Sequence, residues 1–285
     1  MNILIDLIMA LLGGIFGAYI GGLNSFVLCG LFGLIGIGIY MATGDASFIN
    51  EIAFGPMFGP QVSFAGGVAA AAYLGKQSRK GLISESLKLD GTDIVTPIHQ
   101  KENIGALLVG GVFGVVGQAI TMLASNIDSF SMDAAAFAVV VAGMLARLFF
   151  TDSSLVGKDF SFKSRFKDLS FKEIILNAIP AYAVGVLIAK LVEITGVSTF
   201  GFLLGAFTLI FITMGVDFPM THHIGMPAGF AYMVFENIWV AGIFGITGYL
   251  VAEVLRRIFN SNANSHIDHP AFSIFVHSLI FLNIK

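Results

Sequence analysis

The sequence predicts an all-α integral membrane protein of about ten transmembrane helices, built as two five-helix halves that lie in the membrane with opposite orientation. Three observations lead to this fold class: the composition, the position of the basic residues and an internal repeat. The chain is 56% hydrophobic and only 12% charged, with a mean hydropathy of +0.88. Because soluble proteins carry about twice that charged fraction, the composition favours a chain that is mostly in lipid.

Apolar runs of a length that suits membrane spans follow one another along the whole chain, and they leave no room for a separate soluble domain. A helix needs about 20 apolar residues to cross the hydrocarbon core. The expected spans are 3–22, 25–43, 60–75, 103–124, 133–150, 174–193, 198–215, 220–235, 238–255 and 269–284.

The basic residues lie in three connections between these runs, at Lys76–Lys101, Arg147–Lys172 and Arg256–Arg257. Threading ten spans through a bilayer places all three connections on one side. That side then holds all of the 15 Lys and Arg residues except Lys190 and Lys285. Basic loops face the cytoplasm in membrane proteins, so both termini are predicted to be non-cytoplasmic.

Three motifs of the first half recur in the same order in the second half, which indicates an internal repeat. Each half has an odd number of spans, so the second half is expected to be inverted, as in many secondary transporters. The paired motifs are Pro60–Tyr73 with Pro219–Tyr232, Gly111–Gly117 with Gly242–Gly248, and Asp133–Phe137 with Asp268–Phe272.

The repeat divides the chain into a first five-helix half, 1–150, a basic cytoplasmic linker, 151–173, and a second half, 174–285. In the linker, Phe and Lys alternate, which is typical of a helix lying on the inner membrane surface. A solvated, positively charged loop is an equal alternative.

The third span of each half is broken by Gly and Pro, and we expect unwound backbone there. Irregular backbone at membrane depth is tolerated only where it is buried in protein or lines a watery cavity. Corresponding breaks in both halves therefore predict a binding site at their interface. Two tight turns without a ligand are the alternative. The residues assigned to this site from the broken segments are Gln61, Ser63, Gly66, Thr221 and Gly225.

Five of the six histidines fall within the last 64 residues, and they extend the predicted site. His222 and His223 begin the eighth run, while His266 and Asp268 begin the tenth run on the same side of the membrane. We expect the backbone at His222 and His223 to be irregular and their side chains to face a polar space. Imidazole and carboxylate groups suit a proton relay, a solute site or a transition metal.

Three interpretations of Asp268 stay open. It could act only as the N-cap of the last helix, as its counterpart Asp133 suggests, with Pro270 supporting the helix start. It could instead belong to a proton or solute site. Any metal would be held by His222, His223, His266 and Asp268, although the spacing matches no recognised zinc motif.

The segments Phe58–Gly67, Thr221–Ile224 and His266–Ala271 resemble a family of uncharacterised prokaryotic multi-pass membrane proteins, some of which are loosely labelled permeases. The resemblance covers most of the chain and implies a location in the plasma membrane of a prokaryote. It adds weight to Thr221, His222, His223, His266 and Asp268 as a set. His269 stands where this family is expected to have a second Pro, which separates His269 from that set.

The function that the sequence favours is transport of a small solute or ion by a secondary transporter or a channel-like permease. The alternatives are an intramembrane metal-dependent enzyme and a structural membrane subunit that transports nothing. The expected partners are the lipid bilayer, the solute and a second copy of the chain, and the net charge of −3 gives no reason to expect nucleic acid. No Walker motif is present, so we do not expect ATP hydrolysis, and the sequence names no cofactor.

Overall fold

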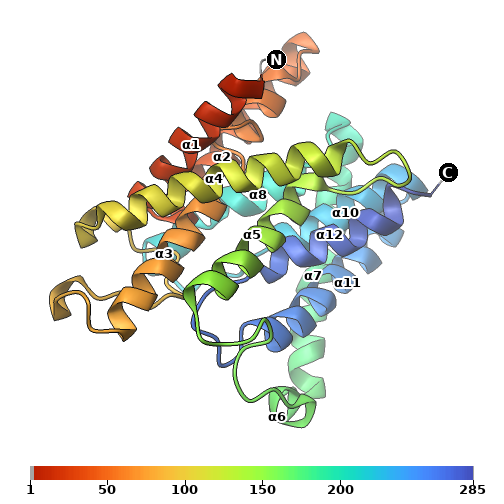
Figure 1. Ribbon diagram of the computed structural model, residues 1–285. Helices are drawn as coiled ribbons and strands as arrows, with labels where there is room; N and C mark the ends of the chain where they lie inside the picture. The colour runs from red at the N-terminus through yellow and green to blue at the C-terminus, as the bar shows by residue number, and fades with distance from the viewer. Residues whose placement is uncertain (1–2, 285) are drawn as a thin grey trace.

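The computed structural model describes residues 3–284, and within them the chain is all-helical (Figure 1). Lys285, whose side of the membrane was part of the topology prediction, lies outside the described residues. The elements are α1 (Ile3–Ile20), α2 (Gly22–Thr43), a π-helical turn η1 (Phe48–Ala53), α3 (Ser63–Arg79), the 3₁₀ turns η2 (Glu85–Leu87) and η3 (Ile98–Lys101), α4 (Ile104–Ser125), α5 (Ala134–Phe150), α6 (Phe162–Phe166), α7 (Phe171–Thr195), α8 (Phe200–Thr208), α9 (Ile210–Thr213), α10 (His222–Phe235), α11 (Ile238–Phe259) and α12 (His269–Phe281).

Every predicted run is occupied by helix, but the helices differ in length. Within residues 3–284, five are long and apolar enough to cross a membrane: α1, α2, α4, α7 and α11. The other five runs hold shorter helices, among them α3 with 17 residues and α10 with 14. α3 and α10 are shorter because non-helical backbone precedes them, and α12 is shorter because it ends at Phe281.

The expected breaks in the third run of each half lie ahead of the helices rather than inside them. Residues 54–62 and 214–221 form turns and irregular backbone, after which α3 and α10 continue without interruption. The prediction of unwound backbone is therefore wrong for Gly66, Gly67 and Gly225, which are helical. Their lack of a side chain serves close packing instead, as described below for the site.

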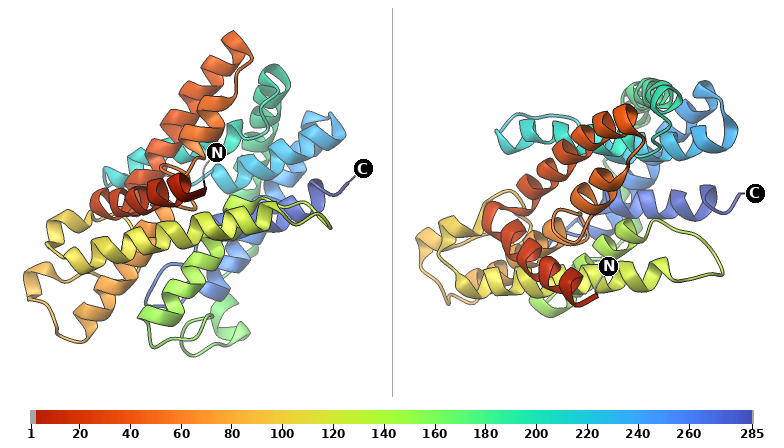
Figure 2. Two further views of the ribbon diagram at one scale, coloured as in Figure 1. Left: turned by 45° about the horizontal axis from the view of Figure 1, so that its top comes forward. Right: turned by 90° about the horizontal axis from the view of Figure 1, so that it is seen from above.

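The same helix pairings occur in both halves of the chain. α1 packs against α3 and α4, and α3 packs against α2, α4 and α5; correspondingly, α7 packs against α10 and α11, and α10 packs against α8, α11 and α12. The halves meet through two pairs, α2 with α8 and α5 with α12 (Figure 2). Each of these pairs joins helices that occupy the same position in the two halves, the second span in one pair and the fifth span in the other.

Glycines set the distance between helices in each half. A Cβ atom placed on Gly114 of α4 would lie 2.4 Å from the carbonyl oxygen of Ala10 in α1. One placed on Gly245 of α11 would lie 2.7 Å from the carbonyl oxygen of Ala181 in α7. No real side chain tolerates these distances, so both crossings depend on the absence of a side chain, as in other small-residue helix contacts in lipid.

Corresponding helices also use the same capping residues. Asn103 caps α4 by accepting a hydrogen bond from the backbone N–H of Ala106, and Asn237 caps α11 by accepting from Trp239 and Val240. Such caps satisfy backbone donors that have no partner within the helix. The recurrence of motifs in the sequence thus has a counterpart in how the helices begin.

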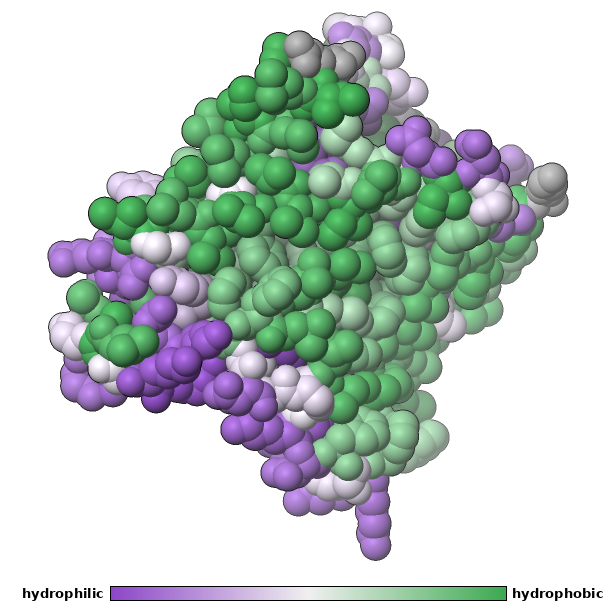
Figure 3. Space-filling view, in the orientation of Figure 1, coloured by the Kyte–Doolittle hydropathy of each residue, from purple (hydrophilic) through white to green (hydrophobic). Residues whose placement is uncertain are grey.

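The surface separates into an apolar belt and a polar edge. Large apolar side chains are exposed along α1, α4, α7 and α11, with Ile104 and Leu123 of α4 more than 70% exposed. Figure 3 shows this apolar face, and it shows hydrophilic residues gathered along the lower left edge, over the loop after α3 and the segment around α6. An exposed apolar surface of this extent suits contact with lipid.

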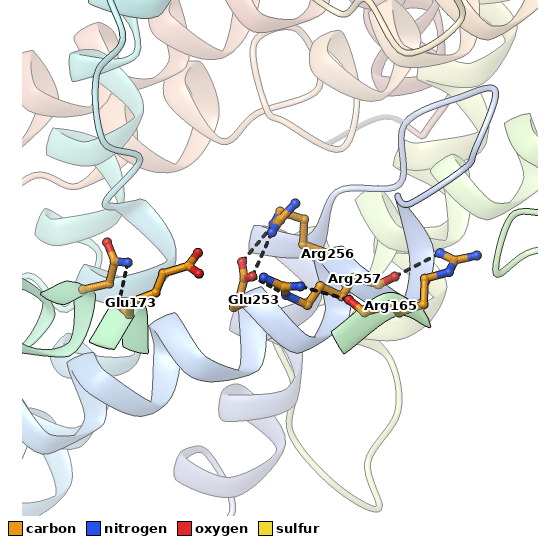
Figure 4. A network of polar contacts seen from close by, with 6 residues as sticks. Arg165, Glu173, Glu253, Arg256 and Arg257 are labelled. Carbon is orange, nitrogen blue, oxygen red and sulfur yellow. Dashed lines mark hydrogen bonds and ion pairs between the residues drawn. The ribbon is translucent and has the colours of Figure 1, made fainter. Parts of the chain in front are cut away.

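The linker between the halves is largely exposed and is tied to the end of α11 by one buried side chain. Its short helix α6 carries Arg165, which is buried and donates to the carbonyl oxygens of Arg257, Ile258 and Ser261 at the end of α11. In return Arg257 donates to the carbonyl oxygen of Arg165 at 2.9 Å (Figure 4). Arginine here satisfies the last carbonyls of a helix and complements its negative end.

A second buried arginine joins the halves at the same end of the molecule. Arg147 of α5 is fully buried, and its guanidinium donates to the carbonyl oxygens of Leu155, Phe259 and Ser265. It also bonds the side chain of Asn260 at 3.2 Å. The last turn of α5 is thereby tied to the end of α11 and to the loop that leads into α12.

The two glycine crossings give a test of the packing. Gly114→Leu and Gly245→Leu should each destabilise the protein by about 1–3 kcal/mol, because the added side chain must push two helix backbones apart. Thermal unfolding of the purified protein in detergent measures the loss. Gly38→Leu is the matched control, since nothing lies within 4 Å of a Cβ at that position. Equal stability of all three variants would contradict the close approach.

Candidate functional site: a cavity between the two halves

A cavity of about 320 Å³ lies where the two halves meet. Its walls come from both helix pairs that join the halves, with Phe26 of α2, Phe202 of α8, Val139 of α5 and Ile274 of α12 among the lining residues. The rings of Phe26 and Phe202 pack edge to face with centroids 5.4 Å apart. The cavity is therefore enclosed largely by apolar groups.

Four helices place their first residues at this cavity. Gln61 lines it just before α3, Asp133 just before α5, His222 at the start of α10 and Asp268 just before α12. Helix N-termini carry backbone N–H groups without intrahelical partners and a partial positive charge. The helix starts thus bring both carboxylates, an amide and an imidazole to the cavity.

Asp133 and Asp268 both cap a helix and both line the cavity. The carboxylate of Asp133 accepts a hydrogen bond from the backbone N–H of Ala136 at 2.8 Å, and that of Asp268 accepts from Ala271. Capping, one of the alternatives for Asp268, is therefore present in both halves. It does not exhaust the role of either residue, because a carboxylate keeps further acceptor sites when one oxygen is used.

Gln61 and His222 bring buried polar atoms that have no partner in the described part of the chain. The Gln61 amide donates to the carbonyl oxygen of Phe54 at 2.9 Å, but its Oε1 atom is buried and unpaired. His222 is 3% exposed, with its ring packed against Phe26 and Phe202, and its Nδ1 atom is also unpaired. Unpaired buried polar atoms are costly, so each of these atoms needs water or a solute.

His266 stands behind Asp268. Its Nε2 atom lies 3.5 Å from Oδ2 of Asp268, and its ring meets Phe64 of the cavity wall edge-on, with centroids 6.3 Å apart. Both side chains are less than a fifth exposed. Of the two groups that were expected to converge, Asp268 and His222 line one cavity, whereas His266 is not among its lining residues.

His223 faces a different space from its neighbour. It lines a second cavity of about 300 Å³ together with Thr221, Tyr249, Glu253 and His269. Its Nδ1 atom is buried and unpaired as well. The expectation of irregular backbone at the twin histidines is wrong, because both belong to the first turn of α10. Successive residues of a helix point about 100° apart, which is why the two rings enter different cavities.

Three residues of the predicted site pack helices together and do not line either cavity. The Ser63 hydroxyl donates to the carbonyl oxygen of Phe58 at 3.2 Å. Gly66 lies against Gly14 and Gly110, and Gly225 lies against Gly201. These glycines let α3 and α10 sit close to their neighbours, which positions Gln61 and His222 at the cavity.

The set considered for a metal does not converge. Within residues 3–284, no group of three or more His, Cys, Asp or Glu side chains is arranged to hold a metal ion. His222 and His223 face separate cavities, and His266 reaches Asp268 at hydrogen-bond range rather than sharing a centre with the twin histidines.

Sequence reasoning missed several residues of the cavity. Asp133 was recognised as a cap but not as a site residue, although its match with Asp268 in the repeat was the available signal. Asn50, Thr121 and Thr199 also line the cavity. They come from loops and helix ends far apart in the sequence, and no local pattern marks them.

Comparison with known proteins places the chain in a family. A family model described as a family of unknown function, DUF7973, matches residues 1–174 and residues 172–284. The chain belongs to this family. No curated protein and no solved structure matches the chain. The DUF7973 matches thus divide the chain close to the predicted linker between its halves.

The double role of Asp133 and Asp268 can be separated by substitution. Asp→Asn keeps a capping oxygen, while Asp→Ala removes it, so only the alanine variants should lose stability, by about 1 kcal/mol per cap. Thermal unfolding in detergent checks this for each position. If Asn and Ala variants are equally destabilised, the charge rather than the cap supports the fold at these helix starts.

Proposed function

We propose that this member of DUF7973 is a membrane transporter or channel-like permease that carries a small solute or ion through the cavity between its halves. The observation that carries the proposal is a cavity between the halves that Gln61, His222 and two carboxylates line in largely apolar surroundings. A buried polar cavity costs stability unless it is occupied, and a site that serves passage is a reason to keep one.

The proposal includes a membrane setting of ten helices in two inverted halves, in the plasma membrane of a prokaryote. Three observations support it. Corresponding helices of the two halves pack against one another in the same way, and α4 and α11 are both capped by Asn. One family model also matches the chain twice. Five helices have the length and composition of full spans, and the shorter α3 and α10 start at the cavity. Short helices that begin at a midplane site are common in transporters built from repeats.

The chemistry of the cavity suits a small polar guest. Asp133 and Asp268 offer negative charge, Gln61 offers an acceptor oxygen, and His222 offers a nitrogen that can accept or donate. Rings such as Phe26 and Phe202 line the space and make most of its wall apolar. A solute of a few heavy atoms fits a volume of about 320 Å³.

The orientation in the membrane is testable with single cysteines. In a Cys29→Ser background, cysteines at Ser86 and Ser164 should resist an impermeant thiol reagent in intact cells, because the basic segments are expected to face the cytoplasm. The same cysteines should react once the membrane is permeabilised. Labelling of either position in intact cells would overturn the proposed orientation.

Passage of a solute through the cavity is testable with a bulky substitution that fills the cavity. Proteoliposomes are mixed with a panel of osmolytes (alkali and ammonium chlorides, methylammonium chloride, sodium acetate, urea and glycerol), and light scattering reports which solutes enter. We expect at least one to enter faster than in protein-free liposomes, and Val139→Trp to abolish the difference because Val139 lines the cavity.

The matched control is Leu148→Trp in the same helix, where the side chain is 56% exposed on the surface. It should leave entry unchanged. The proposal fails if no solute in the panel enters faster with the wild-type protein, or if Val139→Trp and wild type behave alike.

A further inference from the structure

The twin histidines at the start of α10 stand between the two cavities. His222 lines the central cavity, and His223 lines the second. Their ring centroids are 5.6 Å apart and the ring planes are nearly perpendicular, at 88°. Both side chains are more than nine-tenths buried, so the imidazoles form part of the wall that separates two otherwise distinct spaces.

Each of these imidazoles has an unpaired nitrogen. The Nδ1 atoms of His222 and His223 are buried without a hydrogen-bond partner in residues 3–284. A structural histidine in the same protein looks different: His277 of α12 uses both nitrogens, with Nδ1 at 2.7 Å from the carbonyl oxygen of Ser273 and Nε2 at 2.9 Å from the hydroxyl of Thr247. His222 and His223 are therefore not held in place by hydrogen bonds as His277 is.

Proton acceptors stand on both sides of the pair. In the central cavity these are Asp268, backed by His266 at 3.5 Å, and Asp133. The residues that line this cavity include no Lys or Arg, so among the described residues no fixed cation opposes a proton there.

In the second cavity, the groups that face His223 come from three helices. α12 contributes His269, and α11 contributes Tyr249, Glu253 and Arg256. α7 contributes Asn177, and its Glu173 lies nearby (Figure 4). Glu253 is neutralised by hydrogen bonds from Arg256 and Arg257 at 2.8 and 2.6 Å, while the Arg256 side chain is 44% exposed. This cavity thus reaches the end of the molecule that carries the basic residues.

We propose that His222 and His223 conduct protons between the two cavities, so that the solute passage proposed above is coupled to proton movement. A neutral imidazole accepts a proton on one nitrogen and releases another from the opposite nitrogen, so the proton crosses the wall without the ring leaving its place. The proton passes from one ring to the other across their edge-to-face contact, in which the ring centroids are 5.6 Å apart. A proton that moves toward the central cavity ends on Asp268 or on water there. A proton that moves toward the second cavity ends on His269 or on water there.

The test measures charge movement after a pH jump, with no solute present. Proteoliposomes are adsorbed on a solid-supported membrane, and the current is recorded when the outside pH is stepped between 8 and 6. Wild type should give a transient current as protons cross the wall through the pair. His222→Gln, His223→Gln and the double variant should reduce it to the level of protein-free liposomes, whereas His277→Gln should retain it.

A further variant leaves both histidines in place. Ala252 is buried and lines the second cavity, so Ala252→Phe should fill this space and also remove the transient. The pH-jump result stands if these variants run as single species in size-exclusion chromatography. A wild-type protein without a transient, or a double histidine variant that keeps it, would overturn the relay.

The same variants distinguish the relay from the proposed function. If the transient depends on the histidines but no osmolyte in the panel enters, the relay stands and solute passage fails. If an osmolyte enters at a rate that neither a pH gradient nor the double variant alters, solute passage stands and proton coupling is wrong.

Discussion

The central constraint in this molecule is that four helices begin inside its apolar interior. The first turn of a helix leaves backbone N–H groups that need partners, and the interior offers little water. Asp133 and Asp268 meet this need for α5 and α12. At the starts of α3 and α10 backbone carbonyls do so in part, with the N–H of Ser63 bonded to Gly59 and that of Ile224 to Thr221. The cavity lies where these four helix starts meet, and Gln61, Asp133, His222 and Asp268 line it for that reason.

Much of the fold follows from local pattern, and much of the site does not. Apolar runs, caps and glycines are local, so the helix positions, Asp268 as a cap and the involvement of His222 could be predicted from the sequence. Adjacent residues in a helix diverge by about 100°, so the sequence alone could not decide that His223 enters a separate cavity. The partners of Arg147 and Arg165 at the end of α11 and in the loop after it lie 92 to 118 residues away, and no periodicity encodes such contacts.

The basic residues show how one set of side chains can satisfy two requirements. In the sequence they indicate which loops face the cytoplasm. In the structure Arg79 donates to the carbonyl oxygen of Phe150, and Lys76 to that of Phe149, which satisfies the end of α5. Arg165 does the same for α11. The same Lys and Arg residues therefore predict the orientation of the loops and bond the last carbonyl oxygens of α5 and α11, whose negative helix ends favour cations.

The burial of Arg147 has a mechanical consequence. Its guanidinium belongs to the first half, while the carbonyl oxygens of Phe259 and Ser265 belong to the second, so separating the halves at this point would leave a cation and several carbonyls unpaired. The other end of the contact between α5 and α12 is tied as well, because the backbone N–H of Asp133 donates to the Ser278 hydroxyl and the Asn283 amide donates to the carbonyl oxygen of Ser131. The contact of α2 with α8 is made instead by aromatic rings and by the close approach of backbones at Gly30. Polar bonds thus hold the seam between the halves along α5 and α12, whereas van der Waals contact holds it along α2 and α8.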